Sequence, residues 1–165
     1  VGALLAGAVV PGIFNLFRGT ARSNNDVVAI EDIESAAGWI LADGLMALTV
    51  TDGSGGAFPD GVETVCQVDV PCMQLDWTDF SGWGTDANGD PTPHTSIYTL
   101  LTGNRLQRTY DGVSHTIGRN ITDIRFTYDV STRVITMRIT SAPQVIPAQS
   151  ETRTFLMHLR PAVQL

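Results

Sequence analysis

An uncharged, apolar stretch at the amino end constrains this chain more than any other feature. Residues 1–17 read VGALLAGAVVPGIFNLF, and the first charged side chain is Arg18. As a helix, this stretch would rise about 25 Å, which is less than the roughly 30 Å hydrocarbon core of a bilayer. A helix that is apolar on every side is covered by its own core, by lipid or by other helices. We expect lipid or other helices, because a core helix seldom lacks a polar face over four turns.

The small residues of this stretch indicate close helix packing. Ala3 and Gly7 stand four positions apart, as do Ala8 and Gly12, and this spacing lets helix backbones approach in an apolar medium. Pro11 should kink the helix near its middle. Because the chain begins with Val and not Met, we also expect a segment upstream of it. A cleaved signal peptide fits poorly, since the basic residues follow the apolar run and do not precede it.

Residues 23–51 have the pattern of an amphipathic helix. Apolar side chains recur at steps of three and four, among them Ile33, Ile40 and Leu45, and form one stripe. The cluster SNND that begins at residue 23 suits a helix start, and the run DGSGG at residues 52–56 should follow the helix end. The pattern predicts a helix whose stripe packs on the rest of the chain.

The remainder of the chain has the pattern of β-structure. Short runs with alternating or β-branched apolar residues recur at intervals, and turn residues separate them. Sequential strands with short turns favour an antiparallel sheet with one buried face. The expected strands lie at residues 62–70, 73–77, 96–101, 105–110, 121–130, 133–140 and 151–159.

The predicted fold class is α+β. A long N-terminal α-helix, apolar and projecting in its front half and kinked near Pro11, would pack by its rear half on an antiparallel β-sheet. Three parts follow along the chain: residues 1–22 as an apolar membrane or filament-core helix, residues 23–51 as an amphipathic helix packed on the head, and residues 52–165 as a β-rich globular head.

The charged residues narrow the classes of function. All ten basic residues are Arg and none is Lys, which excludes a P-loop phosphate grip and a lysine Schiff base. The formal net charge of −7 repels a phosphate backbone, so no nucleic-acid partner is expected. No nucleophile, base and acid stand in a catalytic pattern, and we expect the chain not to be an enzyme.

Several runs along the chain resemble one protein family. The run VGALLAGAVVP at residues 1–11 resembles the second half of the N-terminal segment of type IV pilins and type II secretion pseudopilins. The run DIESAAGWILADG at residues 32–44 is similar to the helical stretch of minor pseudopilins. The runs IYTL, LQR and IRFTY, at residues 97–100, 106–108 and 124–128, are similar to the strands of J-type minor pseudopilins. The family's N-terminal processing motif does not occur in the sequence.

The resemblance implies a pilin-like fold and a structural role. The chain would be a subunit of an extracellular type IV pilus or pseudopilus, bundled through its N-terminal helix with copies of itself or with other pilins. It would be anchored in the inner membrane before assembly. A minor tip (priming) subunit and a membrane-tethered β-rich module for ligand binding or adhesion remain as alternatives. Filament-core packing is expected of Ala3, Leu4, Leu5, Gly7, Ala8, Val9, Val10, Pro11, Ile13, Phe14, Leu16 and Phe17.

The two cysteines, Cys66 and Cys72, are six positions apart. An even pair in an extracellular chain is typical of a disulfide, and the alternative is two buried thiols. We expect the disulfide, because a filament on the cell surface matures in an oxidising compartment.

A calcium site is the one cofactor hypothesis. Asp86, Asn88 and Asp90 offer oxygen ligands at alternate positions, as in the opening of a calcium-binding loop. Pro91 and Ile97 stand where such a loop carries Gly and a bidentate Glu, so the alternative is a polar turn. No other cofactor is expected.

The histidines and aromatic residues give weaker signals. His94, His115 and His158 share no metal-ligand spacing and are expected on the surface or on strands. Four aromatic residues are expected to cover one end of the sheet, where exposed aromatic side chains could also serve subunit contacts or adhesion. They are Trp77, Phe80, Trp83 and Tyr98.

Overall fold

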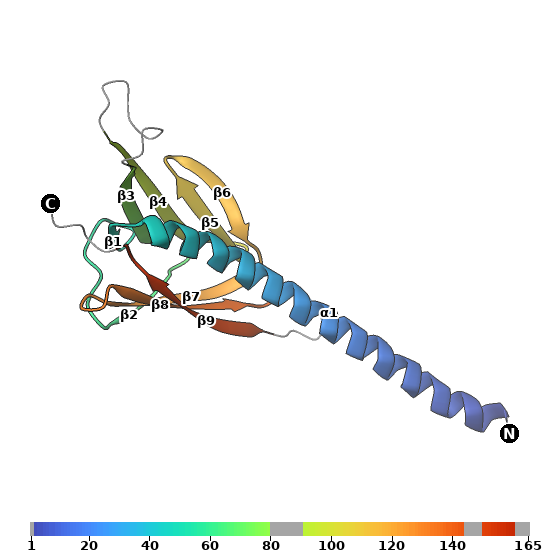
Figure 1. Cartoon of the computed structure of the whole chain (residues 1–165). Coiled ribbons are helices and arrows are strands. Elements are labelled where there is room, and N and C mark those ends of the chain that lie inside the picture. The colour runs from blue at the N-terminus through green and yellow to red at the C-terminus, as the bar shows by residue number, and fades with distance from the viewer. Residues whose placement is uncertain (1, 80–90, 144–149, 161–165) are drawn as a thin grey trace.

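The computed structural model describes residues 2–79, 91–143 and 150–160, with side chains from residue 23 onward. Within these ranges one helix, α1 (Gly2–Met46), precedes nine strands (Figure 1). The strands are β1 (Thr49–Thr51), β2 (Glu63–Val65), β3 (Pro71–Asp79), β4 (Thr92–Leu101), β5 (Arg105–Tyr110), β6 (Val113–Gly118), β7 (Ile121–Asp129), β8 (Val134–Ser141) and β9 (Glu151–His158).

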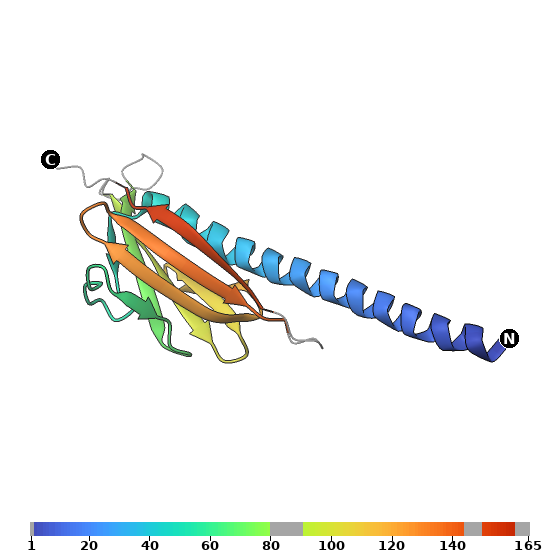
Figure 2. The same ribbon diagram turned by 90° about the horizontal axis from the view of Figure 1, so that it is seen from below.

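The strands form two antiparallel sheets. The first sheet has the order β1-β3-β4-β5-β6, and the second has the order β2-β7-β8-β9. Most neighbours in space are also neighbours in sequence, so hairpins make up most of each sheet. Helix α1 packs against β6 and β9, the edge strands of the two sheets, and against β8. The helix therefore lies across the side where the two sheets approach each other (Figures 1 and 2).

The predicted fold class, a long helix packed on one antiparallel sheet, is wrong. The described part of the chain is mostly β, and its strands divide between two sheets. The physical reason is that both sheets bury alternate side chains, such as Leu75 in β3 and Ile139 in β8. Two half-buried sheets satisfy that pattern by packing on each other, with the helix covering the remaining side.

The helix also differs from the predicted one. It runs through Pro11 and through residues 23–26 without a break, although the sequence predicted a kink and a restart there. It ends at Met46, and Thr49–Thr51 form the short edge strand β1. The hydrogen bonds of the turns on either side hold a helix together across a single missing N–H donor.

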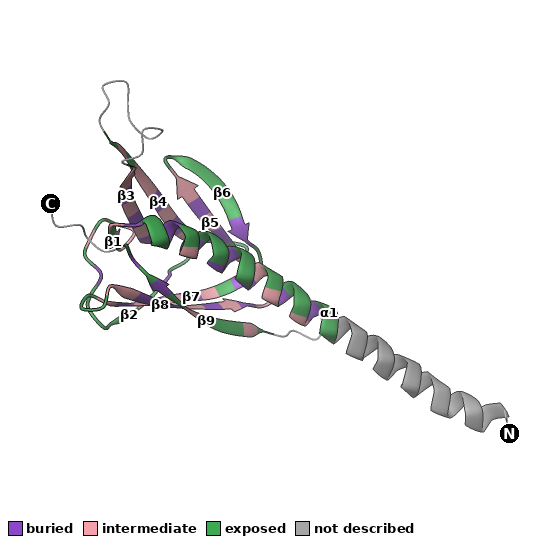
Figure 3. Cartoon of the chain, in the orientation of Figure 1, coloured by how far each residue is buried: buried purple, intermediate pink, exposed green. Residues whose placement is uncertain are grey.

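One core lies between the two sheets and α1 (Figure 3). Its members come from the helix and from strands of both sheets, so neither sheet forms a separate domain. The largest fully buried side chains are Tyr98, Phe126, Ile33, Ile40, Met73, Leu75, Leu106, Ile121, Ile124, Ile135, Met137 and Ile139.

Candidate functional site

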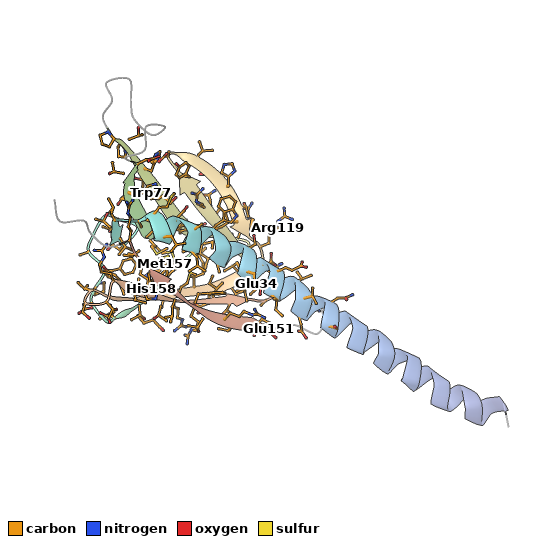
Figure 4. The ribbon with its side chains drawn as sticks, viewed as in Figure 1. Glu34, Trp77, Arg119, Glu151, Met157 and His158 are labelled. Atoms are coloured by element: carbon orange, nitrogen blue, oxygen red, sulfur yellow. A yellow bond between two sulfur atoms is a disulfide. The ribbon has the colours of Figure 1, made fainter. Side chains whose placement is uncertain are left out.

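Helix α1 lies very close to both sheets, because small residues stand at the contacts. A Cβ added at Gly44 would overlap the Sδ and Cγ atoms of Met157 in β9. A Cβ added at Gly118, the last residue of β6, would lie 3.1 Å from the Cβ of Ala36. Trp77 and Met157 approach the C-terminal end of α1 from the two sheets (Figure 4). The helix is thus held between both sheets.

A buried ion pair fixes α1 to the first sheet. The Arg108 guanidinium in β5 donates from Nε and Nη2 to the two carboxylate oxygens of Asp43 on α1, at 2.7 Å each. The Tyr98 hydroxyl in β4 donates to the same carboxylate. Only 5% of the Asp43 side chain and 11% of the Arg108 side chain are exposed. The hydrogen bond with Asp43 raises the pKa of Arg108, and burial together with the Asp43 charge raises the pKa of Tyr98.

Aromatic rings surround this ion pair on its solvent side. The Arg108 guanidinium lies 4.6 Å from the ring centroid of Tyr110 and 5.2 Å from that of Trp39. Tyr110 stacks in turn on Trp77 and His94, with centroid distances of 5.8 and 5.7 Å. Stacking and cation–π contacts stabilise this group, which we call the aromatic cluster: Trp39, Trp77, His94 and Tyr110.

The turn after β5 holds the cluster in place. Asp111 accepts a hydrogen bond from the Thr95 N–H at 2.9 Å, and its other oxygen lies 2.7 Å from Nδ1 of His94. Burial acts to raise the pKa of Asp111, but the hydrogen bonds from His94 and Thr95 lower it overall. Burial likewise raises the pKa of Tyr110. These contacts tie the β5–β6 hairpin to β4.

Two surface hollows flank the aromatic cluster. One of about 280 Å³ lies at the C-terminal end of α1, and one of about 350 Å³ lies between α1 and β6. Apolar side chains beside them are open to solvent: Leu45 is 68% exposed and Trp39 is 50% exposed. Grouped exposed apolar side chains are a common feature of surfaces that contact partners. The first hollow is lined among others by Leu45, Met46, Trp77 and Tyr110, and the second by Trp39, His115 and Thr116.

The exposed apolar side chains beside the two hollows belong to one face of α1. We call it the outward face and define it as the exposed residues of the helix from position 27 onward. Its large side chains are apolar, and its charged side chains are Glu31 and Glu34. Near its middle, an added Cβ at Gly38 would meet no atom within 4 Å. The outward face comprises Val27, Val28, Glu31, Glu34, Ser35, Gly38, Trp39, Ala42, Leu45 and Met46.

The predicted disulfide is confirmed. Cys66 and Cys72 are bonded, and each is 5% exposed. The Cys66 N–H donates to the carbonyl oxygen of Ile124 in β7 at 2.9 Å, whereas Cys72 belongs to β3. The bond therefore joins the second sheet to the first.

The other predicted site residues lie outside what the structure describes. The calcium ligands Asp86, Asn88 and Asp90 fall in the interval 80–90, and the filament-core residues fall in the part of α1 whose side chains are not described. Among the described side chains, no group of three or more His, Cys, Asp and Glu could hold a metal ion. Over the same residues, no helix has the length and apolar character needed to cross a membrane. The calcium site and the filament-core packing therefore remain predictions.

Sequence reasoning missed the residues that position the helix. Leu45 was expected on the buried stripe, but it points outward, and Asp43 is buried in its place. The spacing could have shown this. Asp43 follows Ile40 by three positions and precedes Ala47 by four, so it lies on the same face of the helix as these two buried residues. An acid on such a face needs a buried cation, and Arg108, two positions after buried Leu106 in β5, supplies it.

Comparison with protein-family models, with curated proteins and with solved structures finds no match. A proposal about function therefore depends on the geometry of this chain. The relevant features are a helix that both sheets hold in place, an outward face with apolar side chains, and an uncharged sequence at the start of the same helix.

Proposed function

We propose that the chain is a structural subunit of an extracellular filament of the type IV pilus or pseudopilus class. The observation that carries the proposal concerns α1. It is a single helix of 45 residues that extends beyond both sheets (Figures 1 and 2), and the sequence carries no charge before Arg18. A helix with such a sequence is stable when neighbouring helices or lipid cover it. Packing α1 against α1 of neighbouring subunits would provide that cover and leave the β-rich heads outside.

The attachment of the helix supports a mechanical role. A filament subunit transmits load from its packed helix to its head, so the helix must not slide over the head. The Asp43–Arg108 pair and the close contact of Gly44 with Met157 resist such sliding, and the disulfide joins the two sheets that hold the helix. Contacts of a head-to-tail kind between identical subunits generate open helical assemblies.

The disulfide supports an extracellular location. Disulfides persist in oxidising compartments and are rare in the cytosol. In the proposed sequence of events, the start of α1 lies in the inner membrane until the subunit enters the filament, with copies of the chain or with other pilins.

A charge placed in the uncharged stretch tests the proposal. The full chain is purified in detergent, the detergent is removed, and the material is imaged by negative-stain electron microscopy. We expect filaments from the unmodified chain and none from Val9→Asp, because a buried carboxylate without a partner opposes helix packing. Val113→Asp is the matched control, since Val113 is 57% exposed on the head, and it should form filaments. Absence of filaments from the unmodified chain would contradict the proposal, and filaments from Val9→Asp would show that the uncharged stretch is not their packed core.

A second experiment separates a main subunit from a minor one. Material is sheared from the surface of cells that produce the chain, and the protein composition of any filaments is measured by mass spectrometry. A main subunit would supply most of the mass, and a tip subunit would supply a trace. Absence from the sheared filaments would count against both roles.

A membrane-tethered binding module is the second candidate function. The observation in its favour is the pair of hollows beside the aromatic cluster, with exposed Leu45 and Trp39 at their rims. Such a module would remain a single copy after the detergent is replaced by lipid vesicles, whereas a filament subunit would associate. Light scattering of the reconstituted chain distinguishes the two.

A further inference from the structure

Glu31 is one of the two charged residues on the outward face of α1. Its neighbours one turn before it are Val27 and Val28, which are 51% and 42% exposed. Among the residues whose side chains the structure describes, Glu31 has no hydrogen-bond or ion-pair partner. The next two acids along the helix do have partners. Asp32 accepts a hydrogen bond from the Asn120 side chain at 2.8 Å, and Glu34 forms an ion pair with Arg153 at 2.7 Å.

Covering Glu31 with a partner helix costs free energy, because its neighbours on the outward face are mostly uncharged. If another helix packs on the outward face, the carboxylate loses water among apolar side chains. An unpaired buried charge opposes association, whereas a cation brought by the partner offsets that cost and fixes the register. A partner helix that fits this face therefore carries a cation at the level of Glu31.

The chain itself offers such a cation on the same helix. There is no Lys in the sequence and no Arg between Arg22 and Arg105. Arg18 and Arg22 stand four positions apart, the spacing that puts two residues on one helix face. All acids of α1 come later, from Asp26 onward. Helix α1 is thus positive first and negative afterwards along its length.

Only an offset brings the opposite charges together in a parallel pair. Two parallel helices in register would place Glu31 beside Glu31, which is repulsive. A shift of 9 to 13 residues, about 14–20 Å along the axis, places Arg22 or Arg18 of one helix beside Glu31 of the other. At about 100° per residue, positions 18 and 22 lie on the side of α1 opposite to Glu31, so the contact joins the back of one helix to the outward face of the next. The open space at Gly38 then allows close approach of the two backbones.

We propose that Glu31 on the outward face pairs with Arg18 and Arg22 of α1 in a second copy of this chain, and that this pair sets the axial offset between parallel neighbours. The proposal rests on the proposed filament function and adds to it the identity and register of one contact. The partner is a second copy, because its helix carries both the uncharged stretch and the two cations.

Charge neutralisation provides the first test. In the full chain, assembled as above, Glu31→Gln should raise the lowest concentration that gives filaments by tenfold or more. Glu34→Gln is the matched control, because the Glu34 carboxylate is already paired with Arg153 within its own chain, and it should change that concentration by less than twofold. Circular dichroism should be unchanged in both variants, since both side chains are exposed.

Charge exchange provides the second test. Glu31→Arg should prevent assembly, and so should the double variant Arg18→Glu with Arg22→Glu. The triple variant exchanges all three charges and should assemble again, because opposite charges then face each other across the contact. If the single and double variants failed only because of their net charge, the triple variant would not recover. If Glu31→Gln and Glu31→Arg assemble like the unmodified chain while Val9→Asp does not, the pairing is wrong and the filament function stands. If the unmodified chain forms no filaments, the filament function itself is wrong.

Cysteine cross-linking tests the register. We expect a mixture of Arg22→Cys and Glu31→Cys chains to form a mixed disulfide dimer, because the offset brings these two positions together. Neither variant alone should cross-link efficiently. A parallel pair in register would instead link Glu31→Cys to itself, and that result would overturn the offset.

Discussion

At the scale of single residues, Asp43 decides where α1 sits. Its carboxylate accepts hydrogen bonds from Arg108 in β5 and Tyr98 in β4, and little of it is exposed to water. In such surroundings the pair adds less to stability than a pair of apolar side chains could, but removal of one partner leaves an uncompensated charge. The pair therefore acts chiefly as a constraint on the position of the helix.

This asymmetry predicts the effect of Asp43→Asn. The free energy of unfolding should fall by about 3–5 kcal/mol, because Arg108 stays charged in a buried place. The double variant Asp43→Asn with Arg108→Met should lose less than the single variant. Glu34→Gln is the control, since that carboxylate is 57% exposed and its pair with Arg153 contributes at most about 1 kcal/mol. Urea unfolding followed by tryptophan fluorescence measures all three. An equal loss in the single and double variants would show that the charge is not the cause.

A second prediction at this scale concerns Asp129, the last residue of β7, which accepts hydrogen bonds from the turn to β8. Hydrogen bonds from the Ser131 hydroxyl and the Thr132 N–H lower its pKa from 3.8 to about 2. A lowered pKa means that the turn is stabilised above pH 3.8 and loses that stabilisation as the pH falls through about 2. Carboxyl NMR should give a midpoint near pH 2 for Asp129. Ser131→Ala should move the midpoint upward, and no movement would contradict the assigned cause.

At the scale of elements, the sequence predicted strands better than it predicted their partners. The runs at residues 105–110, 133–140 and 151–159 correspond to β5, β8 and β9, because alternation of buried side chains is visible in a single segment. Which strands share a sheet is not visible in this way. Pairing depends on contacts between segments far apart in the chain, and so the two sheets were predicted as one.

Strand β6 shows a different cause of failure. Its residues from Val113 to Thr116 are all exposed, so they have no apolar alternation to detect. The signal that was overlooked is the turn before it. Asp111 and Gly112 have φ angles of 47° and 84°, the conformation of a two-residue hairpin turn, and an Asp-Gly pair favours that turn. The turn residues therefore predict β6 more clearly than the strand residues do.

Two glycines near the C-terminal end of α1, Gly38 and Gly44, predict opposite results for one substitution. Gly44→Ala should lower the free energy of unfolding by about 1–3 kcal/mol, because the added methyl group overlaps the buried Met157 side chain. Gly38→Ala should raise it by up to about 1 kcal/mol, since the site is open and Ala favours a helix. Both are measured by urea unfolding of unassembled chain in detergent. A gain for Gly44→Ala would mean that α1 lies farther from β9 than described.

At the scale of the whole molecule, charge is divided unevenly along the chain. Residues 23–104 carry thirteen acidic and no basic side chains, whereas residues 105–165 carry eight Arg and four acidic side chains. The fold brings the two parts together, as in the pairs of Asp43 with Arg108, Glu63 with Arg125, and Glu34 with Arg153. Opposite charge thus favours the packing of α1 and the early strands on the later ones.

The candidate site was partly predictable at this scale. The uncharged stretch and the disulfide were read from the sequence, because each is a local pattern. The aromatic cluster was not, since Trp39, Trp77 and Tyr110 come from α1, β3 and β5 and meet only after both sheets have formed. The exposure of Leu45 was predicted wrongly for the same reason. Periodicity shows that a helix has an apolar stripe, but only the position of the sheets decides which edge of that stripe is buried.

The division between head and assembly segment leads to a prediction for truncation. The buried core of the described chain runs from Ala29 to Leu159, and the ion pair, the disulfide and both sheets lie within that range. Removal of residues 1–22 should therefore leave the free energy of unfolding within about 1 kcal/mol of that of the full chain, while the association of copies is lost. Removal of residues 1–41 should unfold the head, because it takes Ile33 and Ile40 out of the core. Sedimentation velocity and urea unfolding measure the two properties separately. A truncated chain that lacks residues 1–22 and unfolds would place that segment in the core of its own subunit, where no neighbouring helix is needed to cover it.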